Sequence, residues 1–162
     1  MIRRSLFLLL AVLVAAPLAA ATIPWTAAGT TAVVDEGSVS LYALTPPYIG
    51  FNSTGLGVIT AYYNVTDTSA TGFPGWTTLQ LSYFDNAAPS QVTAALYRVD
   101  KCDGSILQLC LVTSSDFSTN TCKTCSFAGS VIDFNRYEYY IHATLYRSST
   151  ALDPKLLALR LF

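Results

Sequence analysis

Hydrophobic and polar residues alternate along much of this chain, most clearly in two segments at residues 78–83 and 91–97. Alternation with a period of two is typical of a half-buried β-strand, because successive side chains point to opposite faces. A polar stretch containing Asp85, Asn86 and Pro89 separates the segments and supplies turn-forming residues. The pattern therefore predicts two neighbouring strands, whose inward-facing residues are Leu79, Leu81, Tyr83, Val92, Ala94 and Leu96.

Similar patterns predict further strands from residue 32 to the end of the chain. These strands are expected at residues 32–34, 38–44, 58–65, 131–132, 137–147 and 156–162. Asp103-Gly104 lies between two apolar runs and predicts a tight two-residue hairpin turn. Strands at this spacing are typical of a sandwich or a barrel. We predict an all-β fold, a two-sheet antiparallel β-sandwich of about eight or nine strands with jelly-roll-like or Greek-key connections.

A small outer-membrane β-barrel is the alternative architecture, because the chain is rich in tyrosine and ends in Phe162. Strands of such a barrel need about 9–11 residues and a continuous lipid-facing band. Several of the predicted strands are shorter, and Arg160 shares a strand face with Phe162, where a lipid-facing residue would be required. These observations favour the sandwich.

The first 21 residues have the features of a secretory signal peptide. Arg3 and Arg4 form a basic start, residues 6–16 are apolar, and Ala19 and Ala21 fit a cleavage site of small residues. The apolar run is too short to cross a bilayer as a helix. We therefore predict a cleaved signal peptide at residues 1–21, a single domain at residues 22–162, and an extracellular or periplasmic location.

Loss of the signal peptide changes the charge of the chain. Without Arg3 and Arg4, seven basic residues remain against ten acidic ones, a formal net charge of −3. Nucleic acids and anionic membranes bind basic surfaces, so neither is expected as a partner. We predict no stable membrane insertion, and we expect a protein surface, a glycan or a second copy of the chain as the partner.

Four cysteines, Cys102, Cys110, Cys122 and Cys125, all lie in the second half of the chain. An even number of cysteines in an exported chain predicts disulfides. In a tight hairpin Cys102 and Cys110 would be about five residues apart at ~3.3 Å each, whereas bridged Cα atoms lie ~5.5–6 Å apart. We therefore expect two bridges, each joining one of Cys102 and Cys110 to one of Cys122 and Cys125. A zinc site and a redox-active Cys122-x-x-Cys125 motif are the alternatives, and neither has its usual context.

Residues with catalytic or metal-binding chemistry are sparse. His142 is the sole histidine, and no Gly-x-Ser-x-Gly motif offers a serine to complete a triad with it. No pair of carboxylates suggests a glycosidase, and the oxygens near Asp100 and Asp103 lack the spacing of a calcium loop. We therefore predict no catalytic residue, metal or cofactor. A secreted hydrolase of polysaccharide or ester that uses His142 is the alternative.

Tyrosines are the main resource for binding a ligand. Five of them fall on strand faces opposite the more apolar residues, namely Tyr42, Tyr62, Tyr97, Tyr140 and Tyr146. Exposed aromatic rings can stack on sugar rings or pack against a protein partner. We predict a binding surface formed by Tyr140, His142 and Tyr146. Asn52 and Asn64 begin glycosylation sequons, which matter only in a source that glycosylates exported proteins.

The first strand pair and the last two strands together resemble a group of secreted bacterial all-β sandwich proteins. The resemblance is carried by Leu81, Tyr83, Asp85, Asn86, Leu96, Tyr97, Arg98, Tyr139, Tyr140, Leu159, Arg160 and Leu161. It spans most of the chain after residue 21 and implies a sandwich fold and export. It implies no catalytic residues, and the four cysteines are not part of the shared pattern.

These features together predict a secreted, non-enzymatic β-sandwich module. Its expected role is binding, adhesion or self-assembly at the extracellular or envelope surface, because a tyrosine-rich, weakly charged face suits such contacts. The same prediction includes a homo-oligomer, and a structural subunit of a larger envelope or extracellular assembly is a further alternative.

Overall fold

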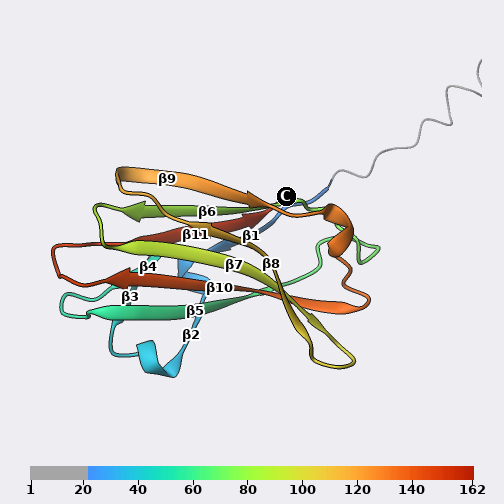
Figure 1. The fold of residues 1–162 in the computed structure, drawn as a ribbon, viewed down its shortest axis with the longest axis horizontal. Helices are drawn as coiled ribbons and strands as arrows, with labels where there is room; N and C mark the ends of the chain where they lie inside the picture. The colour runs from blue at the N-terminus through green and yellow to red at the C-terminus, as the bar shows by residue number, and fades with distance from the viewer. Residues whose placement is uncertain (1–21) are drawn as a thin grey trace, which may run out of the picture.

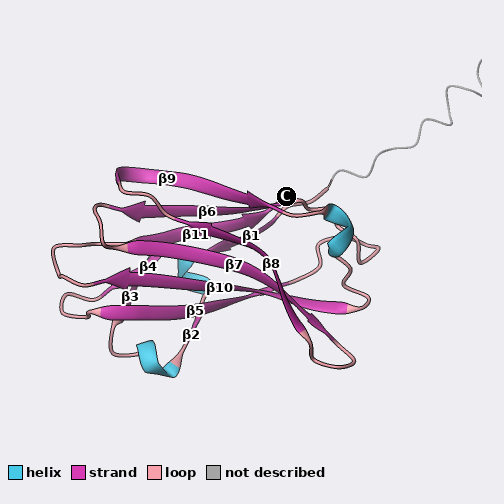
Figure 2. Ribbon diagram, in the orientation of Figure 1, coloured by secondary structure: helices cyan, strands magenta, loops and turns pink. Residues whose placement is uncertain are grey.

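A computed structural model describes residues 22–162, and the predicted signal peptide at 1–21 lies outside the described residues. In the described range the chain forms strands and three short 3-10 turns (Figures 1 and 2). The strands are β1 (Trp25–Ala28), β2 (Val33–Val34), β3 (Tyr42–Thr45), β4 (Tyr48–Phe51), β5 (Gly57–Val65), β6 (Thr78–Asp85), β7 (Gln91–Asp100), β8 (Ile106–Thr113), β9 (Phe117–Ser126), β10 (Tyr137–Arg147) and β11 (Lys155–Leu161). The 3-10 turns are η1 (Gly29–Thr31), η2 (Glu36–Ser38) and η3 (Gly129–Val131).

The strands form two antiparallel sheets packed face to face (Figure 1). The five-stranded sheet has the order β2-β5-β10-β7-β8. The six-stranded sheet has the order β3-β4-β11-β6-β9, and β1 also pairs with β11. The predicted all-β, two-sheet antiparallel sandwich is confirmed. The strand count exceeds eight or nine because short strands such as β1 and β4 occur in segments that show no alternation.

The core consists of the apolar side chains that each sheet turns toward the other. On β10 the inward residues Tyr139, Ile141, Ala143 and Leu145 are all buried, and on β6 Leu79, Leu81 and Tyr83 are fully buried. Burial of one Leu or Ile side chain contributes about 1.5–3 kcal/mol. Since a shift of one residue would turn this set outward, the core fixes the register of each strand.

One predicted strand is wrong, and another begins later than predicted, because β3 covers only the last three residues of the segment 38–44. Alternation in the segment 38–44 predicts Val39 inward, but Val39 is 59% exposed and η2 precedes it. The Asp35 side chain accepts a hydrogen bond from the Gly37 N–H and so starts the 3-10 turn. The segment around Val131 forms η3 in place of a strand.

The β7–β8 hairpin occurs where Asp103-Gly104 predicts it, but its turn is wider than two residues. The Gly104 N–H donates to the Asp100 carbonyl at 2.9 Å, and Gly104 has a φ of 71°. β7 ends at Asp100 and β8 begins at Ile106, so Cys102 lies in the turn and not on the ladder.

One disulfide joins the edges of the two sheets. Cys110 of β8 bonds Cys125 of β9, with a Cα separation of 5.9 Å. Cys102 and Cys122 are free and exposed, so the expectation of two bridges is corrected to one. Cys110 pairs with Leu96 on the β7–β8 ladder, six residues before Cys102, so Cys102 lies beyond the ladder in the turn. Cys125 is taken by the bridge to Cys110, and Cys122 lies opposite Ser82 on the β6–β9 ladder.

Candidate functional site

The outer face of the five-stranded sheet carries a cluster of four aromatic side chains. Alternation along β5, β7 and β10 sends their apolar residues inward and leaves the others on this outer face. Strand register then brings the cluster together, because Tyr62 is opposite His142 and Tyr97 is opposite Tyr140. We call Tyr62, Tyr97, Tyr140 and His142 the aromatic platform.

The rings of the platform pack against one another. Tyr62 and His142 stack with their centroids 5.1 Å apart, and Tyr97 and Tyr140 stack at 5.2 Å. Tyr62 also lies 6.2 Å from Tyr140 in a tilted arrangement, which connects the two pairs. Because the rings of each pair cover one another, solvent meets ring edges and polar atoms as well as the outer ring faces. Mutual packing also restricts the side-chain rotamers before any ligand arrives.

Polar groups surround the platform on the same sheet face. The Tyr97 hydroxyl donates to Gln108 Oε1 at 2.8 Å, and the hydroxyls of Thr93 and Thr144 are 2.6 Å apart. Burial raises the pKa of the Tyr140 phenol, and the neighbouring Tyr97 and Tyr62 raise it further. The Tyr140 hydroxyl therefore keeps its proton near neutral pH and can donate a hydrogen bond to a ligand.

The predicted surface residues Tyr140, His142 and Tyr146 all lie on this face, since they alternate along β10. Tyr140 and His142 belong to the platform. Tyr146 is 38% exposed and lies one row beyond Thr144, opposite Val58 and Gln91, so it stands apart from the rings.

Sequence reasoning leaves Tyr62 and Tyr97 out of the predicted surface, although alternation places both on the less apolar faces of their strands. Tyr62 and Tyr97 belong to the platform because β5 and β7 flank β10 in a particular register. The alternation within each strand does not specify that pairing. Tyr42, another of these tyrosines, packs against the core.

No catalytic arrangement surrounds His142 in the part of the chain that the structure describes. Its neighbours in the register are Tyr62 and Ala95, and no hydrogen bond joins it to a serine or a carboxylate within residues 22–162. Over the same residues, no group of three His, Cys, Asp or Glu side chains could hold a metal ion.

Comparison with protein-family models and with curated protein sequences finds no match. Comparison with solved structures finds similar folds among carbohydrate-binding modules. The xylan-binding module CBM15 has a TM-score of 0.50 and 13% identity, over 87% of this chain and 97% of that one. The CBM36-1 domain of a multidomain xylanase from the hindgut metagenome of Trinervitermes trinervoides has a TM-score of 0.52 and 10% identity, over 86% and 97%. At these identities the likeness establishes the fold.

None of the helices within residues 22–162 combines the length and the apolar character that a bilayer crossing requires.

Proposed function

We propose that this protein is a non-catalytic carbohydrate-binding module that holds a neutral polysaccharide against the aromatic platform. The observation that carries the proposal is the cluster of Tyr62, Tyr97, Tyr140 and His142 on one open sheet face. Sugar rings present apolar C–H faces and hydroxyls, and this cluster offers aromatic surface together with phenol and imidazole hydrogen-bonding groups.

The fold and the charge support the same proposal. A sheet is a rigid support, so side chains projecting from adjacent strands lose little freedom when they bind a ligand. The expected net charge of −3 after signal removal disfavours polyanions and is compatible with an uncharged polysaccharide. The two structural neighbours, the xylan-binding module CBM15 and the CBM36-1 domain of a xylanase, share this architecture.

The test is affinity measurement by isothermal titration with neutral oligosaccharides, beginning with the xylose series. We expect Tyr62→Ala or Tyr140→Ala to weaken binding about tenfold, since loss of one central aromatic contact typically costs more than 1 kcal/mol. Tyr48→Ala is the matched control, because Tyr48 lies on the outer face of the opposite sheet beside Lys155. Equal weakening by all three variants, or none by the platform variants, would contradict the proposal.

We also propose that the module acts outside the cytoplasm, after cleavage of a signal peptide following Ala21. The cross-sheet disulfide supports this location, because disulfides persist in oxidising compartments. The intact mass of the exported protein tests the cleavage site, and a mass that retains residues 1–21 would contradict it.

A further inference from the structure

A polar cleft opens at the end of the sandwich next to the aromatic platform. It has a volume of about 480 Å³ and lies between the loop after β5, the β7–β8 turn and the segment that enters β10. Its lining includes Asn64, Asp67, Lys101, Phe134, Asn135 and Glu138. The cleft shares no residue with the platform.

The strand register makes the cleft continuous with the platform. Asn64 is the partner of Tyr140 across the β5–β10 ladder, so the two side chains are neighbours in one row. Glu138 precedes Tyr140 by two residues on β10 and projects from the same face. His142, Tyr140 and Glu138 therefore form a line along β10 of about 13 Å, at ~3.3 Å per residue. An oligosaccharide lying along this line would pass from the platform into the cleft.

The walls of the cleft are held together by hydrogen bonds between separate segments. The Phe134 N–H donates to the Gly72 carbonyl at 2.9 Å, and Asn135 Nδ2 donates to the Thr71 carbonyl at 3.2 Å. Lys101 Nζ donates to the Phe134 carbonyl at 2.7 Å, which ties the β7–β8 turn to the same wall.

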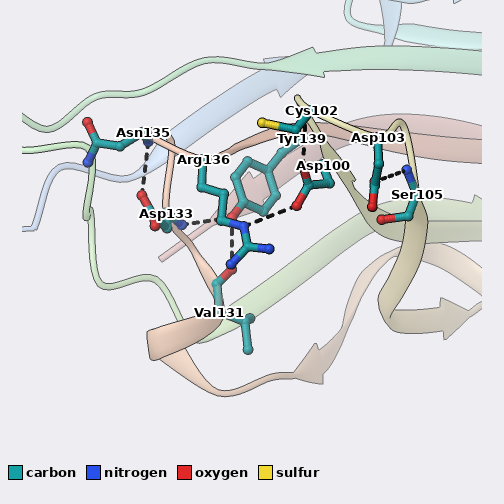
Figure 3. Close-up of polar contacts among 9 residues, drawn as sticks. All are labelled: Asp100, Cys102, Asp103, Ser105, Val131, Asp133, Asn135, Arg136 and Tyr139. Carbon is teal, nitrogen blue, oxygen red and sulfur yellow. Dashed lines mark hydrogen bonds and ion pairs between the residues drawn. The ribbon is translucent and has the colours of Figure 1, made fainter.

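A second set of contacts holds the segment that enters β10 (Figure 3). Tyr139 on β10 donates its hydroxyl to the Val131 carbonyl and accepts from the Asp133 N–H, at 2.8 and 2.7 Å. Arg136 pairs with Asp100 at 3.0 Å. The cleft is therefore formed before a ligand binds, and binding does not have to order its walls.

The groups that line the cleft suit hydroxyls. The Asn64 side chain is exposed and makes no hydrogen bond to the described residues, so both its donor and its acceptor are free for a ligand. Glu138 is 63% exposed and meets Lys101 Nζ at 3.4 Å. This mixture of donors and acceptors matches a sugar hydroxyl, which both donates and accepts.

The charge of the cleft indicates which glycans it accepts. Lys101 contributes one positive charge, whereas Asp67 and Glu138 contribute two negative charges. The ammonium already contacts Glu138 and a carbonyl oxygen. A carboxylate on the ligand would meet a net negative site, so the cleft should discriminate against acidic sugars.

We propose that the cleft is a selective subsite that extends the platform, in which Asn64, Lys101 and Glu138 hydrogen-bond the hydroxyls of an uncharged sugar unit. This inference rests on the proposed glycan-binding function. The glycan body lies along β10 on the aromatic rings, and the cleft selects a neutral unit over a uronate.

The experiment compares oligosaccharides of two to six units, from neutral xylose, glucose, mannose and galactose series, with oligogalacturonate of matching length. The protein is produced in a host that does not glycosylate Asn64. For the neutral series that binds, we expect affinity to rise with chain length in the wild type. Asn64→Ala and Glu138→Ala should each lower the affinity for the longest chain about three- to tenfold and remove most of the gain with length. Oligogalacturonate should bind at least tenfold more weakly than the neutral chain.

The outcomes separate this inference from the proposed function. If Tyr140→Ala weakens binding but both cleft variants keep the wild-type length dependence, the subsite is wrong and the platform stands. Equal affinity for neutral and acidic chains would overturn the charge selection. Failure of all four neutral series to bind the wild type would overturn the proposed function and the subsite together. Far-ultraviolet circular dichroism and thermal melting confirm that each variant is folded.

Discussion

Arg147 shows how a single residue can organise one end of this sandwich. Its guanidinium is buried and donates to three main-chain carbonyls, those of Gly55 and Leu152 at 2.6 and 3.2 Å and that of Asn52. It also lies over the Phe51 ring, 4.6 Å from the centroid. One planar donor group thus joins the loop at 52–55 to the turn that follows β10. Alternation places Arg147 on the inward face of its strand, but the sequence does not reveal these carbonyl partners.

Replacement of Arg147 tests this arrangement. Arg147→Lys keeps the charge but loses the planar fork, so it leaves carbonyls unpaired and should lower the free energy of unfolding by about 2–4 kcal/mol. Urea unfolding measures the loss. Arg160→Lys is the control, since Arg160 is exposed on the outer face of the opposite sheet and should change stability by less than ~0.5 kcal/mol. Similar effects of the two variants would contradict the role of the fork.

Tyr63 predicts how stability responds to alkaline pH. Its hydroxyl donates to the Gly29 carbonyl at 2.8 Å, and burial raises the pKa of the phenol above its ordinary value of 10.0. The unfolded chain then releases this proton at a lower pH than the folded protein does, so stability should fall as pH rises above about 10. Tyr63→Phe should cost about 1 kcal/mol at neutral pH and make the alkaline decline shallower.

Urea unfolding at several alkaline pH values checks the prediction for Tyr63. The comparison uses a background in which Cys102 and Cys122 are replaced by serine, so that free thiols do not exchange with the bridge. If the free energy of unfolding falls equally with pH in this background protein and in its Tyr63→Phe variant, groups other than Tyr63 cause the pH dependence.

Individual strands are predictable where one face is buried and the other is exposed. The inward sets of β5, β6, β7 and β10 follow from alternation alone, because burial of one face imposes a period of two. The strand predicted at 38–44 forms only from Tyr42 onward, because the Asp35 cap and the Ser38 hydroxyl, which accepts from the Thr60 N–H at 2.9 Å, satisfy the preceding backbone in another way. The order of strands in each sheet depends on long-range pairing, which the sequence pattern does not specify.

The bridge between edge strands β8 and β9 makes a prediction at the level of elements. Cys110 and Cys125 are 15 residues apart, and closing a loop of this size in the unfolded chain is worth about 3 kcal/mol. Replacing both residues with alanine should therefore lower the free energy of unfolding by about 2–4 kcal/mol.

Chemical unfolding of this double variant provides the measurement. The matched control replaces Cys102 and Cys122, which are exposed and free, and should leave the unfolding midpoint unchanged. A control as unstable as the Cys110 and Cys125 variant would indicate that the thiols, and not the bridge, account for the loss.

The platform is a property of the whole molecule, because its four side chains come from three strands that are brought side by side by the fold. Two of its members, Tyr140 and His142, could be selected from sequence because they lie two residues apart on one long strand. Tyr62 and Tyr97 become members only through the β5–β10 and β7–β10 registers. The cleft depends on three separate segments and could not be identified without the fold.

The tyrosine-rich faces predict self-association. If the platform forms the contact between copies, a bound glycan should compete with it. A platform occupied by glycan cannot also pack against a second copy, so we expect the mass of a single chain in saturating oligosaccharide. Light scattering after size exclusion, with and without ligand, gives the mass directly. An oligomer that persists when the platform is saturated would place the contact between copies elsewhere on the surface.

The pairing of β1 with β11 determines where another molecule can be attached to this protein. Trp25 lies opposite Leu161, so the start and the end of the described chain run side by side in the six-stranded sheet (Figure 1). The platform lies on the outer face of the other sheet. A bead, a fluorophore or a fused enzyme attached at Phe162 would therefore leave the aromatic platform unobstructed. A short linker that joins the two ends should likewise allow circular permutation, with the new termini placed in a distant surface loop.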